Sequence, residues 1–142
     1  MAIGEQFRVV DLHLDRSQNG PLWLKDPRVA ACIVAALKRG ENPLLQYGLH
    51  AFVVMANHVH ILFTPKVPVA RITRGMKGVA ARDANKILGR IGKRFWQEES
   101  FDHWVRNARE FDRIRNYIEW NPVTAGLAKK SEEWAWSSAS VI

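Results

Sequence analysis

Two histidines separated by one residue, His58 and His60, are the residues of this chain whose type and spacing most directly suggest chemistry. They lie in an apolar run, and side chains on a β-strand alternate between its two faces. Val59, Ile61 and Phe63 would then point into a core, while both imidazoles would share the other face. Two imidazoles held that close on a rigid sheet can chelate one cation. Two half-exposed strand histidines without a ligand fit the same short pattern, which leaves both interpretations open.

A tyrosine and an asparagine four residues apart form a second candidate pair. Tyr117 and Asn121 lie in a segment where Phe111, Ile114 and Ile118 recur at the spacing of a buried helical stripe. Residues four apart are neighbours on a helix surface, so the tyrosine hydroxyl and the amide oxygen would point to one place. The alternative is a boundary tyrosine beside an asparagine that, with the proline after it, ends the helix.

Basic residues are concentrated in one part of the chain. The sequence has 21 Lys and Arg against 14 Asp and Glu, a formal net charge of +7, and a domain this basic most often binds nucleic acid. Segment 66–94 holds nine basic residues and a single acid, Asp83. The candidates for contacts with a phosphate backbone are Arg71, Arg74, Lys77, Arg82, Lys86, Arg90, Lys93 and Arg94. A solvated basic face without a partner is the alternative.

Length and composition predict one ordinary globular domain. The chain has 142 residues, of which 47% are hydrophobic and 25% charged, so we expect a single domain over residues 1–142. The one cysteine, Cys32, excludes an internal disulfide and a multi-cysteine zinc site. No run approaches the roughly 18 apolar residues that span a membrane, and the N-terminus lacks the pattern of a signal peptide. These features predict a cytoplasmic protein.

Hydrophobic periodicity and turn residues predict alternating strands and helices. The expected strands are 7–14, 47–55, 58–63 and 102–105, and the expected helices are 27–40, with a glycine stop at Gly40, 69–88 and 108–120. The break at Ala56-Asn57 predicts a hairpin, and two tryptophans predict that the tail 132–142 packs on the body. This order indicates an α+β fold: a ferredoxin-like antiparallel sheet with helices on one face, plus an added C-terminal helix that bears Tyr117.

Together these motifs resemble a known family. The run 57–62 resembles the HUH motif (histidine, hydrophobic residue, histidine), and the run 117–127 resembles the tyrosine helix of the IS200-like, single-tyrosine HUH transposases. The most similar branch is the REP-associated tyrosine transposases. Further matches are Phe95-Trp96-Gln97, the run 102–106 and the tail 136–139. Ala56 stands where the family commonly has proline, and the N-terminal strand departs from the family's usual opening.

The resemblance implies a metal-dependent DNA strand transferase that cuts and rejoins single-stranded DNA. It gives Tyr117 the role of a nucleophile that forms a 5′-phosphotyrosine, and it makes His58, His60 and Asn121 ligands of Mg²⁺ or Mn²⁺. The implied partners are DNA hairpins from palindromic repeats, bound in the nucleoid by a monomer or a homodimer. His103 also matches the family, either as a ligand or as a hydrogen-bonded strand histidine.

Two other functions are compatible with these residues. A non-catalytic module that binds single-stranded nucleic acid would keep the basic helix without strand transfer. A metal-dependent nuclease would use water, with Tyr117 in a structural role. The presence of the complete set of two histidines, tyrosine and asparagine favours the transferase.

Overall fold

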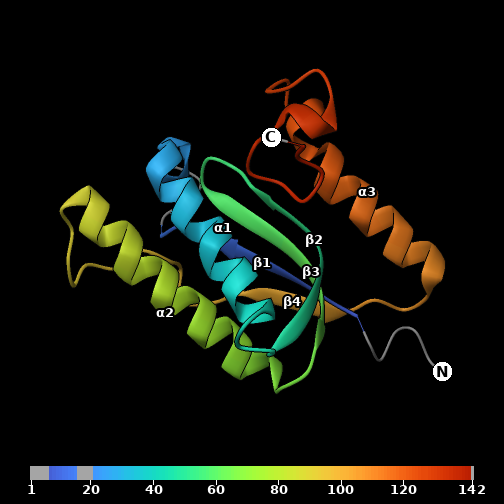
Figure 1. Cartoon of the computed structure of the whole chain (residues 1–142), viewed down its shortest axis with the longest axis horizontal. Helices are drawn as coiled ribbons and strands as arrows, with labels where there is room; N and C mark the ends of the chain where they lie inside the picture. Colours follow the sequence, from blue (N-terminus) through green and yellow to red (C-terminus); the bar gives the residue numbers. More distant parts are fainter. Residues whose placement is uncertain (1–6, 16–20, 142) are drawn as a thin grey trace.

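The structure, a computed structural model, describes residues 7–15 and 21–141 (Figure 1). These residues form four strands and three long helices. Their bounds are β1 Arg8–His13, α1 Pro27–Glu41, β2 Tyr47–Val54, β3 His58–Pro65, α2 Val69–Leu88, β4 Phe101–Trp104 and α3 Ala108–Thr124, with short 3-10 turns at Trp23–Lys25 and Ser131–Glu133. The predicted order of strands and helices is confirmed.

The strands form one antiparallel sheet in the order β2-β3-β1-β4. β2 and β3 form the predicted hairpin, in which Met55 N donates to His58 O at 2.9 Å. Pairing of β3 with β1 places Asp11 opposite His60 and His13 opposite His58. The α+β fold class with an antiparallel sheet is therefore confirmed, and the pairing brings polar residues of β1 beside the two histidines.

The two faces of the sheet bury two different clusters, because successive side chains of a strand alternate between the faces. Val10, Leu12, Val59 and Ile61 pack on the side of α1 and α2, which lie side by side in Figure 1. The cluster on the other face includes Val9, Ala51, Val53, Met55, Leu62 and, from α3, Ile118. His60 alternates with Val59 and Ile61, so it lies on the α3 face.

The boundaries of α1 and α2 follow local signals. The Asp26 side chain caps α1 by accepting from Arg28 N at 2.9 Å, and Pro27 occupies the first helical position. α2 ends at Gly89, whose φ of +68° favours glycine because that left-handed conformation strains other residues. None of the described helices is long and apolar enough to cross a membrane.

The prediction that Gly40 stops α1 is wrong, because the helix continues to Glu41. Gly40 lies against the ring of Tyr47, and a Cβ at position 40 would collide with that ring. The Tyr47 hydroxyl donates to the carbonyl oxygen of Leu37 at 2.5 Å. Glycine at this position therefore allows the first residue of β2 to pack tightly on the last turn of α1.

The prediction that α3 ends before Pro122 is also wrong, because the helix continues to Thr124. Pro122 has no N–H to donate to the carbonyl oxygen four residues earlier, so α3 lacks one backbone hydrogen bond in its last turn. The helix tolerates this loss because only two residues follow the proline before its end. The end is formed by Gly126, which has a φ of +77°. Gly126 N donates to Val123 O at 3.0 Å and Leu127 N donates to Pro122 O at 2.8 Å. This pair of bonds is a Schellman motif, in which a glycine rather than the proline terminates the helix.

The C-terminal tail closes the β2 edge of the sheet. Val53 forms a bridge with Ser137, and Val54 N donates to Trp136 O at 2.8 Å. The indole nitrogen of Trp134 donates to Val54 O at 3.1 Å. The prediction that the tail packs on the body is confirmed. At the opposite edge of the sheet, β4 has four exposed side chains.

Candidate active site

The two histidines of the H-x-H motif lie at the beginning of β3, on the α3 face. Their neighbours Val59 and Ile61 are buried on the other face. The ring centroids of His58 and His60 are 4.6 Å apart, with an angle of 77° between the ring planes. The structure therefore brings the two imidazoles together as strand alternation predicts, and their binding of a metal remains a prediction.

A hydrogen bond fixes the orientation of each imidazole. His60 Nδ1 lies 2.5 Å from Asp11 Oδ1, and His58 Nδ1 lies 2.8 Å from Asn57 Oδ1. Carboxylate and amide oxygens only accept hydrogen bonds, so each Nδ1 donates a proton. The lone pair of each ring is then on Nε2, which is the nitrogen left to bind a cation.

His58 is neutral near pH 7. The pKa of His58 is lowered to about 4, mainly by burial and then by the neighbouring imidazoles of His60 and His13, against the opposing effect of Asp11. His13 stacks on His58 with ring centroids 5.5 Å apart, and burial lowers the pKa of His13 as well. Neutral imidazole is the form that binds a metal, so protons do not compete with a cation at His58 near pH 7.

Tyr117 reaches the histidine pair from α3. Its side chain is 60% exposed, and its ring centroid lies 5.7 Å from that of His60. The next residue, Ile118, is buried in the cluster between α3 and the sheet, which places Tyr117 at the edge of the buried stripe. Asn121 follows one turn later and is half-buried. The fold thus brings Tyr117 to the histidine pair, and Asn121 lies one turn further along the same helix.

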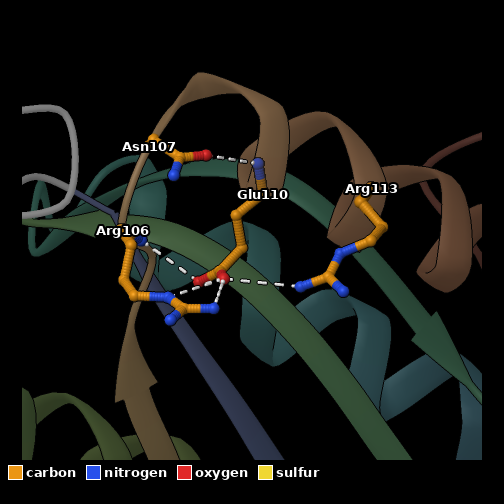
Figure 2. A network of polar contacts seen from close by, with 4 residues as sticks. All are labelled: Arg106, Asn107, Glu110 and Arg113. Carbon is orange, nitrogen blue, oxygen red and sulfur yellow. Dashed lines mark hydrogen bonds and ion pairs between the residues drawn. The ribbon is translucent and has the colours of Figure 1, made fainter.

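A charged network holds the first turn of α3, the helix that also carries Tyr117; Figure 2 shows the four residues of the network. The Glu110 carboxylate accepts from the backbone nitrogen of Arg106 at 3.1 Å and from its guanidinium at 3.0 and 2.8 Å, and it lies 3.4 Å from Arg113 Nη2. Asn107 caps the helix, because its Oδ1 accepts from Glu110 N at 2.8 Å. The hydrogen bonds from Arg106 lower the pKa of Glu110. The carboxylate therefore stays ionised and holds the first turn of α3 near neutral pH.

The predicted metal ligands are two histidines of β3 and one asparagine of α3, and their binding of a metal stays a prediction. His58 and His60 offer two Nε2 atoms, and Asn121 supplies an amide oxygen on α3. Among the residues that the structure describes, no three His, Cys, Asp or Glu side chains are placed to hold one metal ion.

A family model for IS200-like transposases matches residues 38–121. The match spans the segment from the end of α1 into α3 and includes His58, His60, Tyr117 and Asn121. The chain belongs to the IS200-like transposase family. A search of curated proteins finds no match to it.

Two solved structures are similar to this member of the family. A REP-associated tyrosine transposase bound to a REP hairpin is 22% identical with a TM-score of 0.69, and the alignment covers 97% of this chain and 79% of that one. A candidate transposase from Deinococcus radiodurans R1 is 16% identical with a TM-score of 0.49, covering 80% of this chain and 88% of that one. The first structure shows that the IS200-like chain has the fold of a REP-associated tyrosine transposase. The resemblance indicated by the motifs is confirmed at the level of family and fold.

The basic residues predicted to contact DNA lie on α2 and the loop after it, and α2 packs on the face opposite the histidines. Six of the eight are exposed: Arg71, Arg74, Arg82, Lys86, Lys93 and Arg94. Lys77 instead donates to Gln97 O at 2.7 Å and Glu98 O at 3.0 Å, and burial lowers its pKa. The Arg90 guanidinium lies 4.4 Å from the centroid of the Trp23 ring. Both Lys77 and Arg90 therefore make contacts within the chain, while the DNA contacts of all eight remain predictions.

Replacing Arg74 and Lys86 together by alanine should weaken single-strand binding equally for all sequences. Both side chains are exposed on α2, so each would lose a phosphate contact, and the slope of log affinity against log salt should fall by about 0.7 per contact. The measurement is a salt titration by fluorescence anisotropy. The double variant Lys129→Ala, Lys130→Ala removes the same charge from exposed positions after α3 and is the matched control. An unchanged slope in the α2 variant would remove this helix from the DNA-binding surface.

Two residues to which the sequence gives no role, Asp11 and His13, lie in the histidine cluster. The sequence pattern that could have pointed to them is the alternation along β1, where Val10 and Leu12 are apolar and the residues between and after them are polar. Alternation alone gives two polar residues on one face of a strand. The pairing of β1 with β3 places Asp11 opposite His60, and this long-range register is not contained in the local pattern.

The remaining histidines lie on the same face but outside the ring contacts of His58 and His60. His50 lies near the other end of β2, where its Nε2 is 2.6 Å from Thr64 Oγ1 and its ring meets those of Phe7 and Phe111 edge-on. His103 is exposed on β4 opposite Val9. These contacts of His50 suit a packing role.

Proposed function

We propose that this chain cuts and rejoins single-stranded DNA through attack of Tyr117 on a phosphodiester, with a 5′-phosphotyrosine intermediate. The observation that carries the proposal is the meeting of Tyr117 from α3 with the histidine pair of β3, at 5.7 Å between the ring centroids of Tyr117 and His60. Membership of the IS200-like transposase family supports strand transfer on DNA as the reaction class.

In the proposed cleavage, a bond forms between Tyr117 Oη and phosphorus as the bond from phosphorus to the 3′ oxygen breaks. The hydroxyl proton passes to solvent, which reaches a side chain that is 60% exposed, and the departing 3′ oxygen takes up a proton. Rejoining is the reverse, in which a 3′ hydroxyl attacks the phosphotyrosine and releases Tyr117. One phosphate ester replaces another, so the bond energy is conserved and no nucleotide cofactor is required.

The histidines would hold Mg²⁺ or Mn²⁺ through their Nε2 atoms, with Asn121 as the candidate third protein ligand. A divalent cation held there would supply Lewis-acid polarisation of a phosphate oxygen of the substrate. Asp11 and Asn57 keep the two rings in the tautomer that leaves Nε2 free of a proton. These two side chains therefore act as positioning residues for His60 and His58.

The proposed substrates are DNA hairpins from palindromic repeats. The similar REP-associated tyrosine transposase is bound to a REP hairpin, and the net charge of +7 with exposed basic residues on α2 suits a phosphate backbone. We propose that the chain acts as a single domain, as a monomer or homodimer, in the nucleoid of the cytoplasm.

The deciding experiment is incubation of the protein with single-stranded hairpin DNA and Mn²⁺, followed by a denaturing gel. A band in which protein and DNA migrate together after denaturation supports the tyrosine mechanism. Cleaved DNA without that band would show that water is the nucleophile, as in a metal-dependent nuclease. Binding in a mobility-shift assay without cleavage would show a non-catalytic binding module.

Replacing Asp11 by alanine should lower the affinity of the DNA-free protein for Mn²⁺ by about 10- to 100-fold. The change removes the acceptor that fixes the Nδ1 proton of His60, so the ring can rotate or change tautomer. Calorimetric titration with MnCl₂ measures the affinity, and the ¹⁵N shifts of the imidazole report the tautomer directly. Asp11→Asn keeps an accepting oxygen and should restore much of the affinity.

Asp102 provides the matched control for Asp11. It lies on β4 with its carboxylate on the other face of the sheet, where Arg8 Nη2 donates to it at 2.6 Å. Asp102→Ala should leave Mn²⁺ affinity and the His60 tautomer unchanged. Equal metal affinity in Asp11→Ala and the unmodified protein would show that Asp11 has no positioning role.

A further inference from the structure

We propose that Phe101 is a stacking site for a base of the DNA strand that enters the active site. The inference rests on the proposed function, since it requires a single strand held at the histidine pair and Tyr117. The side chain of Phe101 is 57% exposed on β4. Exposed aromatic rings bind unpaired bases with little sequence preference, because every base has a π-face.

Phe101 is one end of a row of aromatic rings that crosses the sheet to Tyr117. The ring of Phe101 meets His13 edge-on, with centroids 5.9 Å apart. His13 stacks on His58 at 5.5 Å, His58 meets His60 at 4.6 Å, and His60 meets Tyr117 at 5.7 Å. The two end rings are exposed, whereas the histidines between them are half-buried or buried. Phe101 is therefore two ring contacts away from the pair that would hold the scissile phosphate.

The register of β4 assigns Phe101 to the active-site face. Phe101 pairs with Asp11, and Asp11 pairs with His60 on the next strand, so all three side chains share one face. Trp104, the other exposed aromatic residue of β4, points to the opposite face, where the Arg8 guanidinium lies 4.2 Å from its ring centroid. On the active-site face the strand thus presents the ring of Phe101, which contacts His13, and the exposed imidazole of His103, whereas Trp104 on the other face lies against the Arg8 guanidinium.

The two edges of the sheet differ in their access to a DNA strand. The tail pairs with residues 52–54 at the β2 edge, where Ser138 N donates to Phe52 O at 2.9 Å and Ser137 bridges to Val53. On the active-site face, α3 packs over the β2 and β3 residues of its cluster. β4 forms the other edge with all four side chains exposed. A strand that leaves the active site across the sheet therefore passes over β1 and β4, where Phe101 lies.

The test compares fluorescein-labelled oligothymidylate with an abasic oligonucleotide of the same length, at one salt concentration. Phe101→Ala should weaken binding of oligothymidylate roughly five- to hundred-fold, the range of one lost base–aromatic stack. Binding of the abasic strand should not change, because it keeps the phosphates and lacks the bases. Phe101→Trp should restore the affinity, and Trp104→Ala should leave it near that of the unmodified protein.

The remaining outcomes separate this inference from the proposed function. If the unmodified protein binds no single strand, both fail. If it binds and forms the covalent adduct, but Phe101→Ala binds oligothymidylate equally well, the stacking site is wrong and the proposed function stands. Sedimentation velocity of the DNA-free protein tests whether a second copy of the chain occupies the β4 edge instead. Loss of a dimer in Phe101→Ala would assign the ring to a contact between two copies and overturn the proposal.

Discussion

Tyr117→Phe should bind hairpin DNA normally, form no covalent adduct and cleave the strand about a thousand-fold more slowly or worse, because removal of a nucleophile has effects of this size. The substitution removes one oxygen and keeps the ring that packs 5.7 Å from His60. The side chain is 60% exposed, so the hydroxyl contributes little to the stability of the fold. A denaturing gel after incubation with hairpin DNA and Mn²⁺ measures the adduct and the cleaved strand together.

The other tyrosine of the chain, Tyr47, provides the built-in control. It is buried, and its hydroxyl donates to Leu37 O at 2.5 Å. Tyr47→Phe should therefore lose about 1 kcal/mol of stability, as expected for one buried hydrogen bond, and should still form the adduct. Cleavage by Tyr117→Phe at near the original rate would identify water as the nucleophile and change the assignment from transferase to nuclease.

The chemistry-bearing residues could be predicted from the sequence where local periodicity decides their position. Alternation along 58–63 fixes the common face of His58 and His60, and helical spacing fixes Tyr117 beside the stripe that contains Ile118. Both patterns depend on residues close together in the chain. The predicted strand face of the histidines and the predicted helix position of Tyr117 agree with the structure, because the apolar residues of each segment must be buried whatever the other segments do.

Other features depend on contacts between distant segments, and the sequence does not determine them locally. Gly40 has the usual character of a helix stop, but its role is set by the ring of Tyr47 that packs on it. Asp11 has no local signal of function, because its importance comes from the register between β1 and β3 that places it opposite His60. The location of basic α2 on the face opposite the histidines likewise follows from the packing of two helices on one side of the sheet.

His58→Ala and His60→Ala should each abolish cleavage and Mn²⁺ binding. Much of the hairpin affinity should remain, because basic α2 and the histidines lie on opposite faces of the sheet. Each change deletes one of the two Nε2 donors and leaves one imidazole with the weaker amide oxygen of Asn121, which should not retain the cation. Most of the DNA affinity should persist, since the exposed basic residues of α2 lie on the other face. Calorimetric titration with MnCl₂, a mobility-shift assay and the cleavage gel measure the three properties separately.

The two variants should differ in stability in a way that tests the assigned hydrogen bonds. His60 is 9% exposed and donates to Asp11, so His60→Ala removes a buried ring together with its hydrogen bond and should cost roughly 1–3 kcal/mol. His58 is only half-buried, so His58→Ala should melt closer to the unmodified protein. His50→Ala, on the same face but bonded to Thr64, should retain metal binding and cleavage. If either histidine variant of β3 folds, cuts DNA and binds Mn²⁺ as well as His50→Ala does, the pair consists of ordinary strand histidines and the cation must be held elsewhere.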